Sequence, residues 1–575
     1  MFALSFLNLI VVALGIVTLG ICLHRVLLPR PIPGIPYKRS SARRILGDVL
    51  DIAKGQMESG EMWKYVGNLS VELKSPIFQM FMRPLGKPWV IITDFREAED
   101  ILMRRQGEFD RSTFLGEVFG PLLPNNHVWM PSDARFRAHR HLLRDTMSPG
   151  FLNGVVAPSI HSAIRNVLDL WKLKCRIAEG RPVQVDEDII RGVVDVVLSV
   201  SYGLQVETIK TQINAILSSG EELLDSGGHD TPVVFPEAED PKIYQSVRTL
   251  IDSIQIGMSS PMPRQHMQFA LSFYPSLVSS RKYLDEVITQ KLRATYQKFT
   301  TNSNSKNQVT CAMDLLVQAE IELATKEARP LQYDTPVIKD ELFGFFTAGH
   351  ETTSTSLRWA VKHLANFPDV QKALRDALRL VHSDAAERGE LPSPEDIVKH
   401  PVAYLDAFIE ENHRQTAAIP TLIRMTTKET YILGHRIPKG TDIFMPVNGP
   451  SYLRPSLAID ESKRSDTSQA AKDRYGKWDD KDIGDFKPER FLITNADGST
   501  SFNPRAGPVM PYGAGLRSCF GIKLAKLELS MIITMIVWSF ELKPPPSELI
   551  TFAAIDKNTH RPQSTYVRLA EGTQK

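Results

Sequence analysis

Residues 511–521 read PYGAGLRSCFG, and an apolar helical pattern follows them through Trp538. The glycines let the backbone turn tightly and approach a flat cofactor closely. Cys519 stands where the helix begins, and unpaired amides and the helix dipole favour a thiolate there. Arg517 supplies a fixed cation for an anionic group nearby. A lone cysteine is more often a small buried hydrophobe, but the spacing GxRxCxG behind an aromatic residue favours a metal ligand.

This loop resembles the haem-binding loop of the cytochrome P-450 superfamily, FxxGxRxCxG, with Tyr512 in place of the usual phenylalanine. The resemblance implies haem b (iron protoporphyrin IX), with the iron on Cys519 and a propionate on Arg517. Gly515, Gly521 and Tyr512 then belong to the same cofactor-binding loop. The tyrosine hydroxyl lies near the proximal face, so we expect slightly altered hydrogen bonding at the sulfur and a slightly different redox potential.

A long helix is predicted from Glu341 to Leu364, and it contains AGHETT at residues 348–353. Ala348 and Thr352 share a face of this helix, and a small residue one turn before the threonine leaves room for a diatomic ligand. A mid-helix threonine beside a glycine can also simply bond back to a carbonyl and bend the helix. By resemblance to the family's oxygen-activating helix, Thr352 positions a proton-donating hydroxyl or water and Glu351 relays protons from solvent.

Two other segments match family motifs. Residues 411–414 (ENHR), in a helical stretch over residues 403–415, match its ExxR helix, and residues 486–491 (FKPERF) match its FxPxRF segment. The resemblance implies a structural cluster of Glu411, Arg414 and Arg490. Spacing alone would let Glu410 pair with Arg414 equally well, and only the family register selects Glu411. Loss of one partner from a buried pair leaves an uncompensated charge, so we expect haem-free, misfolded protein.

Residues 136–140 (FRAHR) occupy the place of the family's WxxxR helix. Arg140 is therefore a second candidate propionate partner, and Arg424 lies where many members have a third. A solvated surface role is the alternative for either arginine. Phe136 keeps the ring but lacks the indole donor, so we expect one fewer haem contact, for which nearby Trp129 is a candidate substitute.

The run from Phe2 to Leu23 carries no charge and, as a helix, reaches about 33 Å, enough to cross a hydrocarbon core of about 30 Å. We interpret it as a retained anchor, because a cleaved signal peptide has a shorter apolar core. Basic residues follow the run, so the positive-inside rule places the body in the cytosol. We expect a single-pass protein of the endoplasmic reticulum membrane.

The fold class expected by resemblance is mainly α with small β-sheets, the cytochrome P-450 fold. We expect a transmembrane anchor over residues 1–28, a stiff proline-rich elbow over 29–40, and one haem-thiolate catalytic domain over 41–575. Residues 89–93 and 441–447 have strand patterns. The polar stretches 300–308 and 461–482 are predicted to be solvated loops.

Bulk composition excludes several classes of function. The 575 residues are 42% hydrophobic and 23% charged, as in a globular protein, and a net charge of +2 gives no argument for nucleic-acid binding. The 4 cysteines are spread too widely for a disulfide framework or a multi-cysteine metal site. Scarce cysteine suits a reducing compartment.

The family resemblance implies a monooxygenase, in which O2, two electrons and a substrate give an oxygenated product and water. Only residues 520–575 follow the cysteine, and no flavin or nicotinamide fingerprint appears, so we expect electrons from another protein. The family's usual partner is a membrane-bound, NADPH-dependent flavoprotein reductase. Its candidate docking face, for which a solvated surface is an equal alternative, is basic: Arg135, Arg137, Arg144, Lys523 and Lys526.

Apolar residues in the family's variable pocket regions suggest a lipophilic small-molecule substrate, and resemblance to fungal members suggests a specialised metabolite. These regions are Arg111 to Val128, part of Glu221 to Tyr283, Phe345 and Phe346, Ile419 to Leu422, and Asp556 to His560. Two alternatives stay open. One is a haem-thiolate isomerase or dehydratase that needs no external electrons, against which the Glu351-Thr352 pair argues. The other is a non-enzymatic haem-binding sensor.

Overall fold

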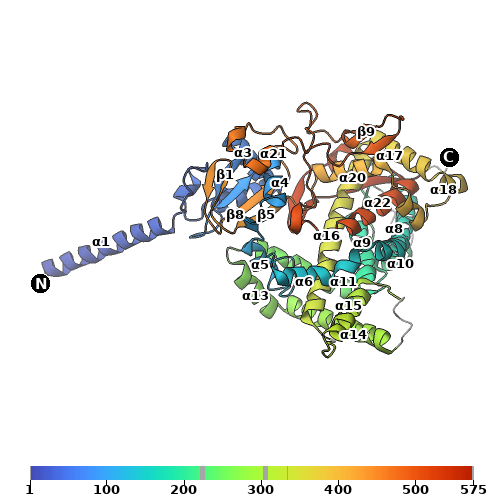
Figure 1. Cartoon of the computed structure of the whole chain (residues 1–575), viewed down its shortest axis with the longest axis horizontal. Coiled ribbons are helices and arrows are strands. Elements are labelled where there is room, and N and C mark those ends of the chain that lie inside the picture. Colours follow the sequence, from blue (N-terminus) through green and yellow to red (C-terminus); the bar gives the residue numbers. More distant parts are fainter. Residues whose placement is uncertain (1, 220–226, 302–307, 333, 573–575) are drawn as a thin grey trace. The chain divides into compact units, whose positions relative to one another are not determined.

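The computed structural model describes residues 2–219, 227–301, 308–332 and 334–572. They group into two compact units (Figure 1). The first unit comprises residues 1–110 and 421–473, and the second comprises residues 111–420 and 474–575. Helices dominate and the sheets are small, so the predicted fold class is confirmed.

The first unit begins with α1 (Phe2–Leu27), the long blue helix of Figure 1. Its segment Ile10–Leu27 is long and apolar enough to cross a membrane, and none of it is buried. The proline-rich stretch that follows has no helix or strand before the short turn η1 (Ser41–Arg43). The buried amide of Gln79 binds this stretch, donating to the carbonyls of Ile32 at 2.9 Å and Ile35 at 2.8 Å. The elbow is therefore fixed to the first strand of the sheet.

A five-stranded sheet forms the centre of the first unit, in the order β1 (Ile77–Met80), β2 (Trp89–Ile92), β8 (Asp442–Pro446), β5 (Thr421–Thr426) and β3 (Phe109–Asp110). β2 and β8 are parallel, with Val90 opposite Ile443, and the other pairs are antiparallel. The ring of Phe444 stacks on Trp89, with 4.0 Å between centroids. The remaining elements of this unit are α2 (Val49–Ser59), α3 (Met62–Glu72), α4 (Phe95–Met103), β6 (Thr430–Ile432), β7 (His435–Ile437), η6 (Glu461–Lys463) and α21 (Asp466–Ala470).

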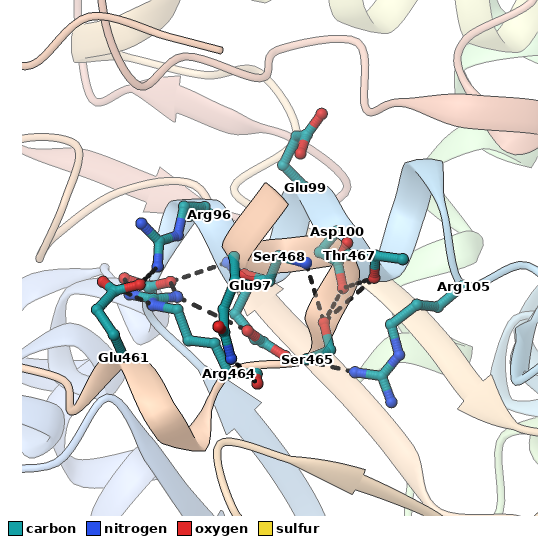
Figure 2. Close-up of polar contacts among 12 residues, drawn as sticks. Arg96, Glu97, Glu99, Asp100, Arg105, Glu461, Arg464, Ser465, Thr467 and Ser468 are labelled. Atoms are coloured by element: carbon teal, nitrogen blue, oxygen red, sulfur yellow. Dashed lines mark hydrogen bonds and ion pairs between the residues drawn. The ribbon is translucent and has the colours of Figure 1, made fainter. Parts of the chain in front are cut away.

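Residues 461–470 pack on α4 through a polar cluster (Figure 2). Buried Arg464 binds both carboxylate oxygens of Asp94, at 2.6 and 3.0 Å. Ser465 and Thr467 donate to Asp100 at 2.6 and 3.0 Å. Most of residues 461–470 are exposed, as predicted, but they form η6 and α21 instead of a loop, and Arg464 and Ser468 are buried. Local charge patterning does not reveal this burial, because the partners lie on a helix that is distant in sequence. In the other predicted loop, residues 302–307 lie outside the described residues.

The second unit contains a core of long helices, and α16 (Pro336–Asn366) packs against α9 (Asp186–Tyr202) and α22 (Ile522–Ser539) (Figure 1). Its other α-helices are α5 (Thr113–Phe119), α6 (Ala134–Leu142), α7 (Pro149–Phe151), α8 (Ala157–Ala178), α10 (Thr208–Ser218), α11 (Lys242–Asp252), α12 (Ile254–Met258), α13 (Pro263–Phe273), α14 (Pro275–Thr301), α15 (Ala312–Lys326), α17 (Pro368–Val381), α18 (Ser383–Arg388), α19 (Pro394–Lys399) and α20 (Ala403–Gln415). The long helix predicted from Glu341 to Leu364 is confirmed as part of α16.

The start of α16 follows from its sequence. Thr335 is the N-cap, and its hydroxyl accepts from the amide of Ile338 at 3.3 Å, while Pro336 needs no donor at the first helical position. Gly344 lets a loop approach this helix, since a Cβ there would lie 2.1 Å from the side-chain nitrogen of Asn126. The loop around Asn126 therefore lies directly on α16.

The strands of the second unit come late in the sequence, except for β4. One has the order β11 (Phe540–Lys543), β14 (Tyr566–Glu571) and β4 (Val183–Gln184). Two hairpins are formed by β9 (Leu492–Thr494) with β10 (Thr500–Phe502), and by β12 (Ala554–Asp556) with β13 (His560–Pro562). The second hairpin brings its turn against α16, where the candidate site is built.

Candidate active site

The cysteine loop leads directly into α22. Gly513 and Gly515 have φ of +63° and +71°, which L side chains rarely adopt, so glycine is strongly favoured at both positions. The amide of Cys519 donates to the carbonyl of Tyr512 at 2.8 Å, closing the loop. A Cβ at Gly521 would meet no atom within 4 Å, and the Cys519 side chain is exposed. The loop therefore presents one thiol on an open glycine surface.

The pKa of the Cys519 thiol shifts in the direction opposite to the one expected for a thiolate favoured by the helix start. Desolvation by surrounding protein raises the pKa of Cys519, even though the side chain reaches solvent. The amide of Gly521 and the guanidinium of Arg140 lower it, but less strongly. Because the thiolate is the metal-binding form, a bound cation would supply the charge compensation that the protein alone does not.

Arg140 and Arg517 both contact the ring of Phe136, which is buried on α6. The guanidinium of Arg517 lies 3.7 Å from the ring centroid and that of Arg140 lies 5.8 Å from it. Arg140 also lies 4.7 Å from the ring of Phe520, next to the cysteine. Cation–π contacts thus hold two cations beside the loop. Trp129 does not supply a free indole donor, because it donates to the carbonyl of Leu123 at 2.8 Å.

A buried carboxylate that the sequence analysis missed ties this region together. Glu341, on α16, accepts from Nδ1 of His127 and Nδ1 of His139, each at 2.7 Å. It also accepts from the side chain of Asn126 at 3.1 Å. Burial raises the pKa of Glu341, but these histidine bonds outweigh it and the net shift is downward. Arg517 donates to the carbonyl of His127 at 3.1 Å, so the cluster also supports the cysteine loop.

The predicted oxygen-side residues lie in mid-α16. The hydroxyl of Thr352 donates to the carbonyl of Ala348 at 2.6 Å, the back-bonding considered from the sequence. Glu351 accepts from the hydroxyl of Thr559 at 3.0 Å. His350 is buried and stacks on Phe346, with 5.8 Å between ring centroids, and burial lowers its pKa to about 4. The imidazole is therefore neutral.

The predicted structural cluster forms, with Glu411 as its centre. Arg414 binds both oxygens of Glu411 at 2.7 and 2.8 Å, and both side chains are buried. Arg490 donates to the same carboxylate at 3.3 Å. Trp478 lies 5.4 Å from each of the two guanidinium groups. Spacing left Glu410 as an alternative partner, and the geometry selects Glu411.

Tyr512 and Arg424, also predicted to bind the cofactor, lie in different surroundings. The Tyr512 ring meets that of His413 edge to face, with 5.3 Å between centroids, and its hydroxyl makes no hydrogen bond to the described residues. Burial, with smaller contributions from nearby acidic groups, raises the pKa of Tyr512 well above its usual value. Arg424 is buried on β5 of the first unit and donates to the carbonyl of Ile423 at 2.8 Å.

The metal-ligating side chains available around Cys519 indicate which kind of metal centre fits it. Within residues 2–572, gaps excepted, no group of three or more His, Cys, Asp and Glu side chains is placed to hold a metal ion. A metal at Cys519 must therefore bring most of its ligands with it, as in a macrocycle. Arg140 and Arg517 would suit carboxylate groups on such a macrocycle. The residues fit haem.

Comparisons with known proteins agree with this geometry. The cytochrome P450 family profile matches residues 43–452 and 484–562. The chain is similar to a cytochrome P450 monooxygenase of Pestalotiopsis microspora, 44% identical over 97% of each chain. It is also similar to one of Fusarium sporotrichioides, 33% identical over 96% of this chain and 97% of the relative.

A solved structure is similar in fold. The crystal structure of a cytochrome P450 (CYP102L1) superposes with a TM-score of 0.66 at 16% sequence identity, covering 95% of this chain and 99% of that one. At this identity the likeness concerns the fold alone. Residues 453–483, which include Trp478 and the segment that packs on α4, lie outside the matched family segments.

Proposed function

The chain belongs to the cytochrome P450 family and is a monooxygenase, and we propose that it is a membrane-anchored enzyme that oxygenates a lipophilic small molecule. The observation that carries the proposal is the isolated thiol of Cys519, on an open glycine loop at the start of α22. The reaction takes O2, two electrons, two protons and a substrate, and it gives the oxygenated product and water.

Family membership implies haem, and the donor set supports haem b with Cys519 as the iron ligand. When bound, haem supplies the activation of dioxygen, with the thiolate favouring O–O cleavage. We assign the propionates to Arg140, Arg517 and Arg424. Gly515, Gly521 and Tyr512 complete the binding loop.

The loop itself is supported by structural contacts. The buried cluster of Glu411, Arg414 and Arg490 fixes α20, whose His413 meets the ring of Tyr512 in the cysteine loop. The carboxylate of Glu341 holds the loop and helix that contact Arg517. These residues take no part in the chemistry, and they keep the cofactor contacts rigid.

Glu351 and Thr352 are assigned to proton delivery. Because Thr352 donates its hydroxyl hydrogen to Ala348, its oxygen lone pairs are free to accept a hydrogen bond from a water molecule. A water held in this way can pass a proton on, and Glu351 resupplies protons from solvent. This pair supports a monooxygenase over an isomerase, a dehydratase or a sensor, none of which requires a supply of protons to dioxygen.

The electrons come from a redox partner, as family membership implies, and we assign this role to an NADPH-dependent flavoprotein reductase. The five basic residues predicted for its docking face are all exposed in the structure. The apolar helix α1 supports membrane anchoring, and we place the enzyme in the endoplasmic reticulum membrane with both units, as one catalytic domain, in the cytosol. The fungal relatives favour a role in specialised metabolism.

The carbon monoxide difference spectrum of the reduced protein tests the central assignment. A thiolate-ligated haem gives a strongly red-shifted band, and Cys519→Ala is expected to abolish it. Cys175→Ala, at a half-buried cysteine, is the control and is expected to keep the band. Persistence of the band in Cys519→Ala overturns the assignment. Dependence of NADPH and O2 consumption on the added reductase separates a monooxygenase from the isomerase and sensor alternatives.

A further inference from the structure

The turn between β12 and β13 rests on α16 beside Glu351. The indole of Trp359, on α16, donates to the carbonyl of His560 at 2.8 Å. The imidazole of His560 binds Asp556 at 2.6 Å across the hairpin. Asn558 donates to the carbonyl of Ile251 at 3.0 Å. The turn is therefore fixed from several sides, and Thr559 is held in one place.

Thr559 belongs to a chain of hydroxyl groups that ends on Glu351. Its hydroxyl donates to Oε1 of Glu351 at 3.0 Å and lies 2.8 Å from the hydroxyl of Thr355. A hydroxyl has one hydrogen, so Thr355 must donate to Thr559. The oxygen of Thr355 in turn accepts from the guanidinium of Arg358 at 3.1 Å. Every hydrogen in the chain thus points toward the carboxylate.

The far end of the chain is a buried cation. Arg358 is 4% exposed, and its nearest carboxylate is that of Asp186, at 4.0 Å. A guanidinium does not release a proton in proteins, so Arg358 is no proton source. It orients the two hydroxyl groups instead. The chain consequently acts on the position of Glu351, and it does not deliver protons to it.

The two carboxylate oxygens of Glu351 differ in their hydrogen bonding. Oε1 is bound by Thr559, whereas Oε2 makes no hydrogen bond to the described residues, and the neutral Nδ1 of His350 lies 3.9 Å from it. The side chain is 18% exposed, so water reaches it. One oxygen is therefore fixed and the other is left free for exchange with water.

We propose that Thr559 is a positioning residue for the reaction: it holds Oε1 of Glu351 so that Oε2 faces the water that carries protons. The inference rests on the proposed function of Glu351 in proton delivery. Without the hydroxyl of Thr559, the carboxylate loses the one hydrogen bond that it makes to the described residues and adopts several rotamers. Proton delivery then slows, and more of the consumed oxygen leaves as hydrogen peroxide, by the two-electron, two-proton reduction of O2.

The test compares full-length Thr559→Val, which keeps the shape and removes the hydroxyl, with Thr559→Ser, which keeps the hydroxyl. The first readout is the fraction of NADPH electrons recovered as hydrogen peroxide with added reductase. The second needs no turnover: it is the infrared C–O stretching band of the reduced carbon monoxide complex, which responds to polar groups near the ligand. The control is Thr551→Val, because within the described part of the chain the hydroxyl of Thr551 makes one hydrogen bond, which it accepts from the amide of Ala553 at 3.1 Å.

We expect Thr559→Val to raise the ratio of peroxide to water roughly three- to tenfold, as for the loss of one hydrogen bond, and to shift or broaden the C–O band. Thr559→Ser and Thr551→Val are expected to resemble the wild type. In a Glu351→Gln background the valine substitution should add nothing, because both changes act through one carboxylate. An equal effect in that background would overturn the inference.

The two proposals fail in different ways. If the wild type lacks the red-shifted carbon monoxide band, the proposed function fails. If the wild type has the band and Thr559→Val changes neither readout, only the positioning role fails. Should Thr559→Val not fold, Thr355→Val replaces it, since it removes the donor that directs Thr559 toward Glu351. A smaller change in the same direction is expected, and no change overturns the inference.

Discussion

Arg464 binds both carboxylate oxygens of Asp94 in a buried ion pair that joins residues 461–470 to α4. Glu97, which is fully buried, lies 3.7 Å from the same guanidinium. The exposed pair of Arg96 and Glu461 borders the cluster (Figure 2). Residues 461–470 lie outside the matched family regions, whereas their partners Asp94 and Glu97 lie inside them.

Arg464→Ala should destabilise the first unit strongly, because it leaves the carboxylate of Asp94 buried without its cation and leaves Glu97 with Arg105 alone. We expect a loss of about 3–5 kcal/mol in the free energy of unfolding, measured by urea denaturation. The control is Lys463→Ala, which removes an exposed cation next to it in sequence and should cost little. Equal effects from the two variants would contradict a buried anchor.

The pH dependence of stability should report on Glu97. Burial above all, aided by Asp94 and Asp100, raises the pKa of Glu97 from 4.5 to about 7, although Arg105 and Arg464 oppose the shift. The folded state therefore binds this proton more tightly than the unfolded state. The stabilisation is complete below about pH 4.5 and is lost as the pH rises through about 7.

Glu97→Gln mimics the protonated side chain, so it should flatten this part of the stability profile. We expect the variant to lose about 1–3 kcal/mol less than the wild type between about pH 5 and pH 8. Unfolding free energies at a series of pH values provide the measurement. A profile parallel to that of the wild type would mean that Glu97 is ionised throughout.

The sequence alone predicted those parts of the site whose residues are close together along the chain. The loop around Cys519, the helix carrying Glu351 and Thr352, and the ExxR segment are contiguous patterns with fixed spacing. Glu341 could not be found in this way, because its histidine partners lie 214 and 202 residues away along the chain. The direction of the Cys519 pKa was also beyond the sequence, since desolvation depends on surrounding residues from several elements.

Phe136→Ala should weaken haem retention, because the ring holds the guanidinium groups of Arg517 and Arg140 beside the cysteine loop. Cation–π contacts of this kind contribute about 0.5–2 kcal/mol, so we expect haem to dissociate roughly 2- to 30-fold faster. Transfer of haem to an excess of an apo-haem protein measures the rate. Phe136→Trp retains a ring and should dissociate no faster than the wild type, and the prediction fails if Phe136→Ala does the same.

Glu411 and Glu410 offer an adjacent matched pair. Glu411→Gln removes the carboxylate that Arg414 and Arg490 share, leaving two buried cations with weaker partners. Glu410→Gln removes a carboxylate with no ion pair among the described residues, and burial already raises the pKa of Glu410 to about 7. We expect little haem-containing protein from the first variant and a normal yield from the second, as measured by the ratio of haem absorbance to total protein. Similar yields would contradict the selection of Glu411.

Thr352→Ala should separate oxygen consumption from productive chemistry. The substitution removes the hydroxyl that donates to Ala348, but it leaves the helix backbone intact, since alanine is the best helix former. Haem content and the carbon monoxide spectrum are therefore expected to be normal. Without a hydroxyl to hold the proton-donating water, reducing equivalents should be diverted to hydrogen peroxide, because general acid catalysis of this kind contributes roughly 10²–10⁴-fold.

Thr353→Ala is the matched control for Thr352→Ala. The hydroxyl of Thr353 donates to Glu528 at 2.8 Å on another side of the helix, and its loss should leave the peroxide fraction near that of the wild type. An unchanged peroxide fraction in Thr352→Ala would remove this residue from proton delivery and leave its back-bond to Ala348 as a purely structural feature of α16.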